Sequence, residues 1–287
     1  ACGGSSGSSG GSGIPGGSGD SNGGESTTSG PAYSVPGSVA LVAFNEGAAQ
    51  TGNECAIDTS QLAQGVVGAS ARSDARLKFQ VVKGEMSYNY DLPGDGTPII
   101  VPINMGDGPY TFRVMQNTSG NNYVELFSVI ENVNLSSETA PFLVPNMFVN
   151  YNESSAVVAK ARELAQGAAN QGDVVRNIYQ WVVDNITYDH DKAAQLASAT
   201  GYVPDPDATL ASGTGICFDY ASLGAAMLRS VGIPARIVTG YVSPNDFYHA
   251  WIMVYIDGTW HTVQFSVNPG EWSRVDLTFA STGGGSY

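Results

Sequence analysis

The hydrophobic periodicity of the chain changes near residue 150, and this change constrains the fold more than any other feature. Between about residues 36 and 150, apolar residues alternate with polar ones, as at Leu77, Phe79 and Val81, and short turn sequences separate the runs. Alternating runs of this kind predict strands with one buried face. Beyond residue 150 the apolar spacing becomes helical. The sequence therefore predicts an α+β protein whose first domain is an antiparallel β-sandwich-like domain.

The alternation repeats in three further runs of the first domain, and we expect each run to be a strand. Their inward residues are predicted to be Met86, Tyr88 and Tyr90, then Phe112 and Val114, then Phe127 and Val129. Cys55 lies in the same domain without a nearby histidine, so its expected role is that of a small buried hydrophobe. This domain carries no group of residues that suggests catalysis.

The second domain, expected at residues 151–287, alternates helices and strands. Ser154-Ser155 and Asp173 are predicted to cap two successive helices, and residues 203–207 are predicted to form a loop. A further apolar helix is expected from about Cys217 onwards. Strands are then expected at 249–256, 259–265 and 272–279, the first two joined by the Asp257-Gly258 turn.

The first 35 residues consist mostly of Gly and Ser, and we expect them to form a disordered tether. Three regions follow from these patterns: a tether at 1–35, a β-rich accessory domain at 36–150 and a second domain at 151–287. Ala1-Cys2 is similar to the mature end of a bacterial lipoprotein, which implies an acylated Cys2 and an extracellular protein anchored to the cell membrane by lipid. The alternative is a linker with a stray cysteine.

The charge of the chain limits its partners. The formal net charge is -14, with only 12 Lys+Arg. Such a surface repels phosphate backbones, which argues against nucleic acid and against a polybasic membrane contact. No apolar run reaches the roughly 18 residues that a membrane-spanning helix needs. Three cysteines and three histidines without zinc spacing predict neither a metal site nor a cofactor.

The residues around Cys217 suggest thiol chemistry. Cys217 follows Gly213-Thr214-Gly215 at the expected start of a helix, where free amide groups and the helix dipole stabilise a thiolate. The two glycines are expected to let the backbone approach a substrate closely. His249 and Asp276 follow on later strands. Nucleophile, base and orienting carboxylate, in this order, suit acyl transfer through a thiol.

Several segments of the second domain resemble the transglutaminase-like superfamily, which has a papain-like thiol fold. The resemblance implies the triad Cys217, His249 and Asp276, each at the position of a family motif. The motifs are Tyr179–Tyr188, Gly215–Ala221, Arg229–Arg236, His249-Ala250-Trp251 and Trp272–Ala280. Each motif alone is weak, but the full set in this order along the chain is specific for the family.

The sequence departs from the family pattern near the third residue of the triad. The family often has Asp-Pro-Thr where this chain has Asp276-Leu277-Thr278. In some members the Asp comes soon after the His, near Gln264 here, which holds an imidazolium less well than a carboxylate does. His190 is a rival base with acidic neighbours. His261 is expected on a solvated strand face, and Asp219 is expected to be structural.

These observations predict an extracellular cysteine peptidase or amidase, or an acyltransferase, that forms an acyl-enzyme on Cys217. The expected substrates are amide bonds of protein or cell-wall peptide at the cell surface, with hydrolysis favoured over crosslinking. Two alternatives remain open: a protein-crosslinking transglutaminase, and a non-catalytic binding or structural protein of the surface.

Overall fold

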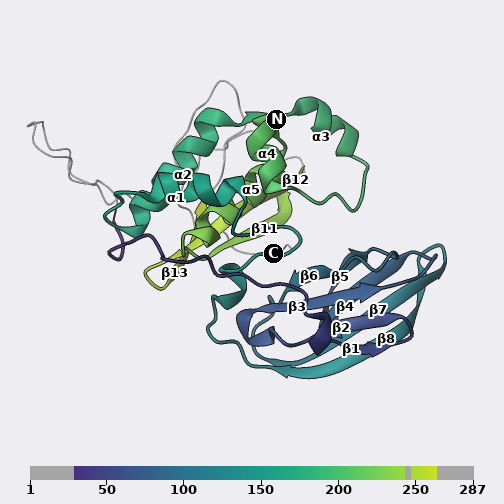
Figure 1. Ribbon diagram of the computed structural model, residues 1–287. Coiled ribbons are helices and arrows are strands. Elements are labelled where there is room, and N and C mark those ends of the chain that lie inside the picture. Colours follow the sequence, from purple (N-terminus) through teal and green to yellow (C-terminus); the bar gives the residue numbers. More distant parts are fainter. Residues whose placement is uncertain (1–28, 243–246, 264–287) are drawn as a thin grey trace, which may run out of the picture.

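The computed structural model describes residues 29–242 and 247–263, and in these ranges the two halves of the chain have different architectures (Figure 1). Residues 50–133 form the β-rich half, and residues 156–263 form the helical half, in which helices cover a sheet. Most of the predicted tether and the strand expected at 272–279 lie outside the described residues. None of the helices in the described ranges is long and apolar enough to cross a membrane.

The β-rich half contains two four-stranded sheets in which all paired strands are antiparallel. One sheet has the order β1 (Gln50–Gly52), β2 (Cys55–Asp58), β3 (Val66–Ala71) and β6 (Ile99–Pro102). The other has the order β5 (Met86–Leu92), β4 (Leu77–Lys83), β7 (Gly108–Ser119) and β8 (Asn122–Val133). Buried side chains of both sheets, among them Ile57, Phe79 and Phe112, form one hydrophobic core. The predicted antiparallel, sandwich-like domain is therefore confirmed.

The inward faces of these strands follow the predicted alternation with one exception. Leu77, Phe79 and Val81 are all buried, and Cys55 is buried as expected. Met86, however, is 58% exposed, so its predicted inward position is wrong. Met86 pairs with Lys83 at the hairpin end of β4 and β5, beyond the core. The inward face of β5 begins further along the strand, at Tyr90 and Leu92.

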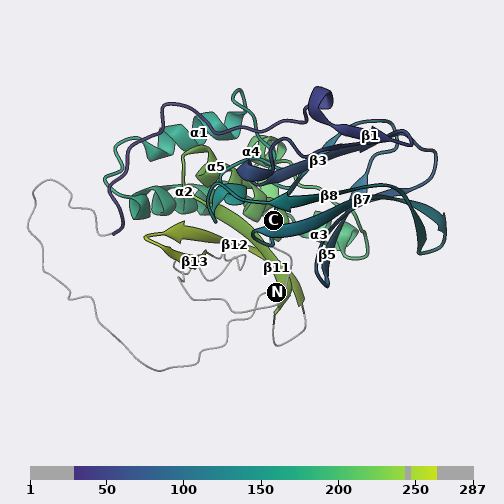
Figure 2. The same cartoon turned by 90° about the horizontal axis from the view of Figure 1, so that it is seen from below.

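The helical half is built around α5 (Cys217–Ser230), whose residues from Asp219 to the end are all buried. The helices α1 (Ala156–Ala165), α2 (Gln171–Asn185) and α4 (Pro206–Ser212) contact α5. The sheet β11 (Ala235–Val242), β12 (Phe247–Ile256) and β13 (Thr259–Val263) is antiparallel and contacts it as well. Figures 1 and 2 show α1, α2 and α5 together on one side of this sheet. Apolar residues of α5, β11 and β12 share one core.

Three local predictions in the helical half need correction or refinement. Ser155 precedes α1 as expected, but its Oγ accepts a hydrogen bond from Asn152 N rather than from the helix. Asp173 is not the cap of α2. Asn170 is the cap, and its side chain accepts from Asp173 N at 2.9 Å. The predicted loop at 203–207 ends early, because Asp205 caps α4 through Ala208 N.

The end of the predicted tether lies against the helical half. Tyr33 OH donates to Val231 O at 2.8 Å, and Tyr33 N donates to Ala169 O at 3.1 Å. Gly172 leaves no room for a side chain there, since a Cβ on it would lie 2.3 Å from Ser29 O. The chain therefore packs against the start of α2 and the end of α5 before it enters the β-rich half.

The segment between the halves, which includes the short helix η3 (Ala140–Phe142), is fixed to α5. The guanidinium of Arg229 is buried and donates to Val144 O at 2.9 Å and to Ala235 O at 2.8 Å. Burial lowers the pKa of Arg229 to about 10. Ser222 Oγ donates to Phe148 O at 2.6 Å. These bonds hold the connecting segment beside the helix that begins at Cys217.

Candidate active site

Cys217 is the first residue of α5, and Ile216 is the N-cap. The N–H groups of a first helical turn have no acceptor within the helix, and they carry the positive end of its dipole. A thiolate at this position is stabilised by both effects. The thiol is half-buried, so it is accessible from one side while packing against the core on the other. The structure thus places Cys217 where the sequence predicted it, at a helix start.

The backbone before Cys217 is held by a short parallel pair of strands, β9 (Thr187–Tyr188) and β10 (Thr214–Gly215). Thr187 N donates to Gly213 O at 2.8 Å, and Asp189 N donates to Gly215 O at 2.9 Å. Gly213 ends α4 with a φ of 69°, a conformation that favours glycine. The two glycines therefore shape the turn that leads into α5.

Gly215 has a packing role that the sequence did not suggest. A Cβ on Gly215 would lie 2.6 Å from the Cβ of Asp219, closer than real side chains approach. The missing side chain lets the carboxylate of Asp219 fold back onto the start of the helix. Asp219 Oδ2 accepts from Ile216 N at 2.9 Å, one residue before the thiol. The contact that Gly215 permits is thus with Asp219, whereas the sequence predicted one with substrate.

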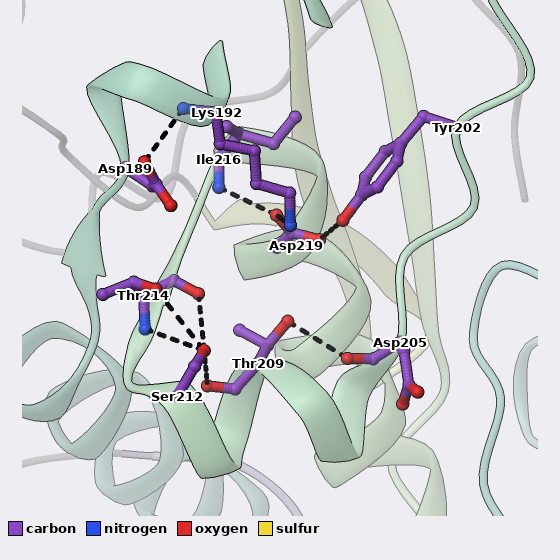
Figure 3. A network of polar contacts seen from close by, with 9 residues as sticks. All are labelled: Asp189, Lys192, Tyr202, Asp205, Thr209, Ser212, Thr214, Ile216 and Asp219. Carbon is purple, nitrogen blue, oxygen red and sulfur yellow. Dashed lines mark hydrogen bonds and ion pairs between the residues drawn. The ribbon is translucent and has the colours of Figure 1, made fainter. Parts of the chain in front are cut away.

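Asp219 is fully buried and accepts hydrogen bonds from two side chains of the preceding segment (Figure 3). Lys192 Nζ donates to Asp219 Oδ2 at 2.8 Å, and Tyr202 OH donates to Asp219 Oδ1. Lys192 comes from α3 (His190–Leu196), and its ammonium also lies 4.8 Å from the centre of the Tyr202 ring. A buried carboxylate with three donors confirms that Asp219 is structural.

The network perturbs the ionisation of both donors. Burial, together with the hydrogen bond to Asp219, raises the pKa of Tyr202 to about 12, so the phenol stays protonated and donates. Partial burial alone would lower the pKa of Lys192. The hydrogen bonds to Asp219 and Tyr202 outweigh burial, and the pKa is raised. At neutral pH Lys192 is therefore an ammonium and Tyr202 a neutral phenol, and both donate to Asp219.

A cavity of about 840 Å³ opens in front of Cys217, and both halves of the chain line it. The β-rich half contributes residues of β4 and β5, and the helical half contributes residues around α3, α5, β11 and β12. Phe148 connects the two sides, since its ring lies 6.0 Å from that of Tyr90 and 5.8 Å from that of Phe218. The aromatic and larger apolar lining residues are Tyr90, Met147, Phe148, Tyr188, Leu196, Tyr202, Val203, Ile216 and Phe218.

His249 lies on β12 next to Ala250, which lines the same cavity as Cys217. The imidazole is 7% exposed, and burial lowers its pKa. Its ring stacks on Trp251, with centroids 6.0 Å apart and an interplanar angle of 23°. A buried imidazole of this kind stays neutral at pH 7, as a general base must.

The alternation of β12 constrains how His249 can reach the thiol. Ala250, Ile252 and Val254 face α5 in the core, so His249 and Trp251 lie on the other face of the strand. The alternation of the strand alone therefore does not pair the imidazole of His249 with Cys217 Sγ. The pairing of these two residues remains a proposal.

Other residues predicted for the site are placed as follows. Asp276, its rival Gln264 and the lipidation residue Cys2 all lie outside the described residues. His190 is exposed at the start of α3, with its ring against Tyr188. His261 is half-buried on β13.

Three contributors to the site were not predicted from the sequence. They are Lys192, Tyr202 and the cavity wall from β5. Lys192 and Tyr202 are 27 and 17 residues away from Asp219, so no local pattern connects them. Within the described ranges, no group of three or more His, Cys, Asp or Glu residues is arranged to hold a metal ion.

Comparison with known proteins gives a family for the helical half. Residues 158–276 match the model of the transglutaminase-like superfamily. This stretch includes Cys217, His249 and Asp276, and it begins within α1. The family match therefore covers the helical half and leaves the β-rich half outside it.

Curated relatives include archaeal and mammalian proteins. A UPF0252 protein of Methanocaldococcus jannaschii is 25% identical over 198 residues, which cover 65% of this chain and 54% of the relative. The kyphoscoliosis peptidase of Mus musculus is 31% identical over 126 residues, which cover 40% of this chain and 18% of the relative. The chain thus spans about half of the archaeal protein and less than a fifth of the mouse peptidase.

Among solved structures, a candidate cysteine protease from Cytophaga hutchinsonii is similar to this chain. It has 18% sequence identity and a TM-score of 0.38, and the match covers 70% of this chain and 74% of the other. A structure described as a TGase has 22% identity and a TM-score of 0.35, over 45% of this chain and 37% of the other.

Proposed function

Because residues 158–276 match the transglutaminase-like superfamily, we propose that this protein is a thiol enzyme that attacks amide carbonyls through Cys217. His249 acts as the base that takes the thiol proton and returns it to the leaving amine. Asp276 orients the imidazole. The peptide group of Cys217, at the start of α5, donates to the oxyanion that forms on the attacked carbonyl. The observation that carries the proposal is the position of Cys217, at a helix N-terminus and facing a cavity large enough for a peptide.

The reaction proceeds in two balanced steps. In the first, Sγ bonds to the carbonyl carbon, the C–N bond breaks, and the amine leaves with the proton held by the imidazolium. In the second, His249 takes a proton from water, the hydroxide attacks the thioester, the C–S bond breaks to release a carboxylic acid, and the imidazolium returns its proton to Sγ. A lysine amine in place of water would give a crosslink instead.

Hydrolysis is favoured over crosslinking. The cavity lies open beside the thiol, so water reaches an acyl-enzyme there without an ordered amine site. The mouse and human relatives named as peptidases are consistent with this choice, although the chain covers less than a fifth of their length. Protein or cell-wall peptide at the cell surface is the proposed substrate class. A non-catalytic surface protein is the second candidate, and it requires an unreactive Cys217.

The test compares wild type, Cys217→Ala and Cys55→Ala in two assays: release of fluorescence from labelled casein, and incorporation of dansylcadaverine into unlabelled casein. Cys217→Ala is expected to abolish activity while its far-UV circular dichroism stays that of wild type. Cys55→Ala serves as the matched control, because Cys55 is buried in the β-rich half. Full activity in a folded Cys217→Ala protein would contradict the proposal. Dansylcadaverine incorporation without casein cleavage would favour crosslinking.

The extracellular location and the lipid anchor stay predictions from the sequence. Expression with a bacterial lipoprotein leader, followed by Triton X-114 partition, tests them. The wild type is expected in the detergent phase and Cys2→Ser in the aqueous phase, and aqueous partition of both forms contradicts the anchor.

A further inference from the structure

One buried hydroxyl in the cavity beside Cys217 has no hydrogen-bond partner among the described residues. Thr239 lies on β11, directly opposite Ala250 on β12, and both residues line the cavity that Cys217 faces. Thr239 is 4% exposed, and its Oγ1 is not bonded to any protein group of the described ranges. The cavity wall thus contains a polar atom that the fold itself does not use.

An unsatisfied buried hydroxyl is costly to a fold. Leaving such a group without a partner forfeits its hydrogen bonds to water and gains none in return. The neighbouring residue of the same face, Ile237, is fully buried and apolar, as is Ile252 on β12. Valine has the shape of threonine and would fill the same space without this cost. A threonine at this position therefore suggests a use for the hydroxyl outside the packing of the sheet.

The surroundings indicate what the hydroxyl would bind. Most of the cavity lining is aromatic or aliphatic, and such a lining offers few groups that can orient a polar main chain. The hydroxyl of Tyr202 is already used by Asp219. The charged pair Lys78 and Asp91 is contributed by the β-rich half, and its members bond each other. Thr239 places a buried hydroxyl on the β11 wall of the cavity, and Ala250 opposite it is small enough to let a chain approach.

We propose that Thr239 is a substrate-binding residue whose Oγ1 hydrogen-bonds to a peptide group of the acyl-donor substrate, next to the carbonyl that Cys217 attacks. A hydroxyl both donates and accepts, so it can bond either the N–H or the C=O of a main chain. The proposal rests on the proposed function of Cys217. It adds that the ligand of this cavity is a peptide main chain, bound at the β11 wall.

The alternative role for Thr239 is structural, and the two roles make opposite predictions for stability. If the hydroxyl only supported the fold, its replacement by valine would destabilise the protein. If the hydroxyl serves the substrate, Thr239→Val removes an unsatisfied buried group, and the melting temperature stays equal or rises. Thr239→Ser keeps the hydroxyl and provides the matched control.

The experiment measures the inactivation of Cys217 in the full chain by two reagents. Iodoacetamide reports the reactivity of the thiol alone, whereas benzyloxycarbonyl-Phe-Ala fluoromethyl ketone also presents a peptide main chain. In Thr239→Val, the iodoacetamide rate is expected to stay within about twofold of wild type. The peptidyl rate is expected to fall about tenfold, which corresponds to about 1.4 kcal/mol. Thr239→Ser should keep both rates, and the melting temperature of Thr239→Val should not fall.

Each contrary outcome has a defined meaning. A less stable Thr239→Val protein with unchanged rates would show that the hydroxyl is structural and would overturn the proposal. A peptidyl reagent that modifies wild-type Cys217 no faster than it modifies free cysteine would overturn it too, since the cavity would then not recognise a peptide main chain. If wild-type Cys217 reacts with neither reagent, the proposed function fails first. A reactive Cys217 with a silent Thr239→Val change refutes only the role of Thr239.

Discussion

Replacing Asp219 by Asn tests whether the buried carboxylate behind Cys217 organises the site. The change keeps the size of the side chain and removes its charge. Asp219 accepts from Ile216 N, Lys192 Nζ and Tyr202 OH, and these partners all donate (Figure 3). An asparagine has one carbonyl oxygen and an NH₂ group that only donates. The amide can keep the bond to Ile216 N, but it no longer neutralises the ammonium of Lys192.

The size of the effect follows from the exposure of the two partners. A hydrogen bond to a charged group contributes about 1.5–3 kcal/mol. The side chain of Lys192 is 31% exposed and can turn partly to water, whereas that of Asp219 is 0% exposed. We therefore expect Asp219→Asn to lower the free energy of unfolding by about 2 kcal/mol. For a chain of this size the melting temperature would fall by roughly 4–8 °C.

Activity should fall with stability, because the network holds two parts of the site. Ile216 precedes the thiol, and Tyr202 lines the cavity. A small displacement of either residue is expected to lower kcat/KM for labelled casein about tenfold or more.

The matched control is Asp205→Asn, the same chemical change at an exposed cap. Asp205 accepts from Ala208 N at 3.2 Å, and asparagine caps helices equally well. Urea unfolding followed by tryptophan fluorescence measures the stability of both variants. An Asp219→Asn protein as stable and as active as Asp205→Asn would refute the proposed role of the network.

Three further predictions concern other parts of the site. Gly215→Ala should destabilise the protein by about 1–3 kcal/mol, because the new Cβ would lie 2.6 Å from the Cβ of Asp219. Gly37→Ala is the control and should be neutral, because a Cβ there would meet no atom within 4 Å. Equal melting temperatures of the two variants would contradict the predicted clash at Gly215. Burial lowers the pKa of His249 in the folded state, so the unfolded state binds more protons and stability should fall as the pH drops through about 6.5. Urea unfolding at pH 7.5 and 5.5 should show a smaller loss in His249→Gln than in wild type, and equal losses would refute the pKa shift. Activity should survive excess EDTA, and a loss that calcium restores would point instead to a metal-dependent enzyme.

Local patterns in the sequence predicted the elements and the position of Cys217 well. Side chains alternate along a strand, so the buried face of β4 could be read from Leu77, Phe79 and Val81. The prediction failed at Met86 because a hairpin end extends beyond the core, and alternation alone does not show where the core stops. The start of α2 was misplaced for a related reason. Asn170 and Asp173 are both good caps, and three residues of sequence do not decide between them.

The walls of the site could not be predicted in this way. Periodicity shows which face of an element is buried, but not which element covers it. Phe148 contacts Tyr90 and Phe218 across the two halves of the chain, and Lys192 reaches Asp219 over 27 residues. These contacts depend on how the halves pack together. Cys217 was predictable because the chemistry of a thiolate at a helix start is local, whereas a substrate cavity is a property of the tertiary fold.

The most direct test of the central claim is the rate of carboxamidomethylation of Cys217 as a function of pH. The measurement uses iodoacetamide on the Cys2→Ser protein and quantifies each labelled cysteine by mass spectrometry. Burial raises the pKa of the Cys55 thiol, so Cys55 should stay unlabelled and serve as the internal control. For Cys217 a thiolate stabilised at the start of α5 predicts a midpoint clearly below about 8.5, the value of a free cysteine. A midpoint at or above this value would contradict the assignment of Cys217 as the nucleophile.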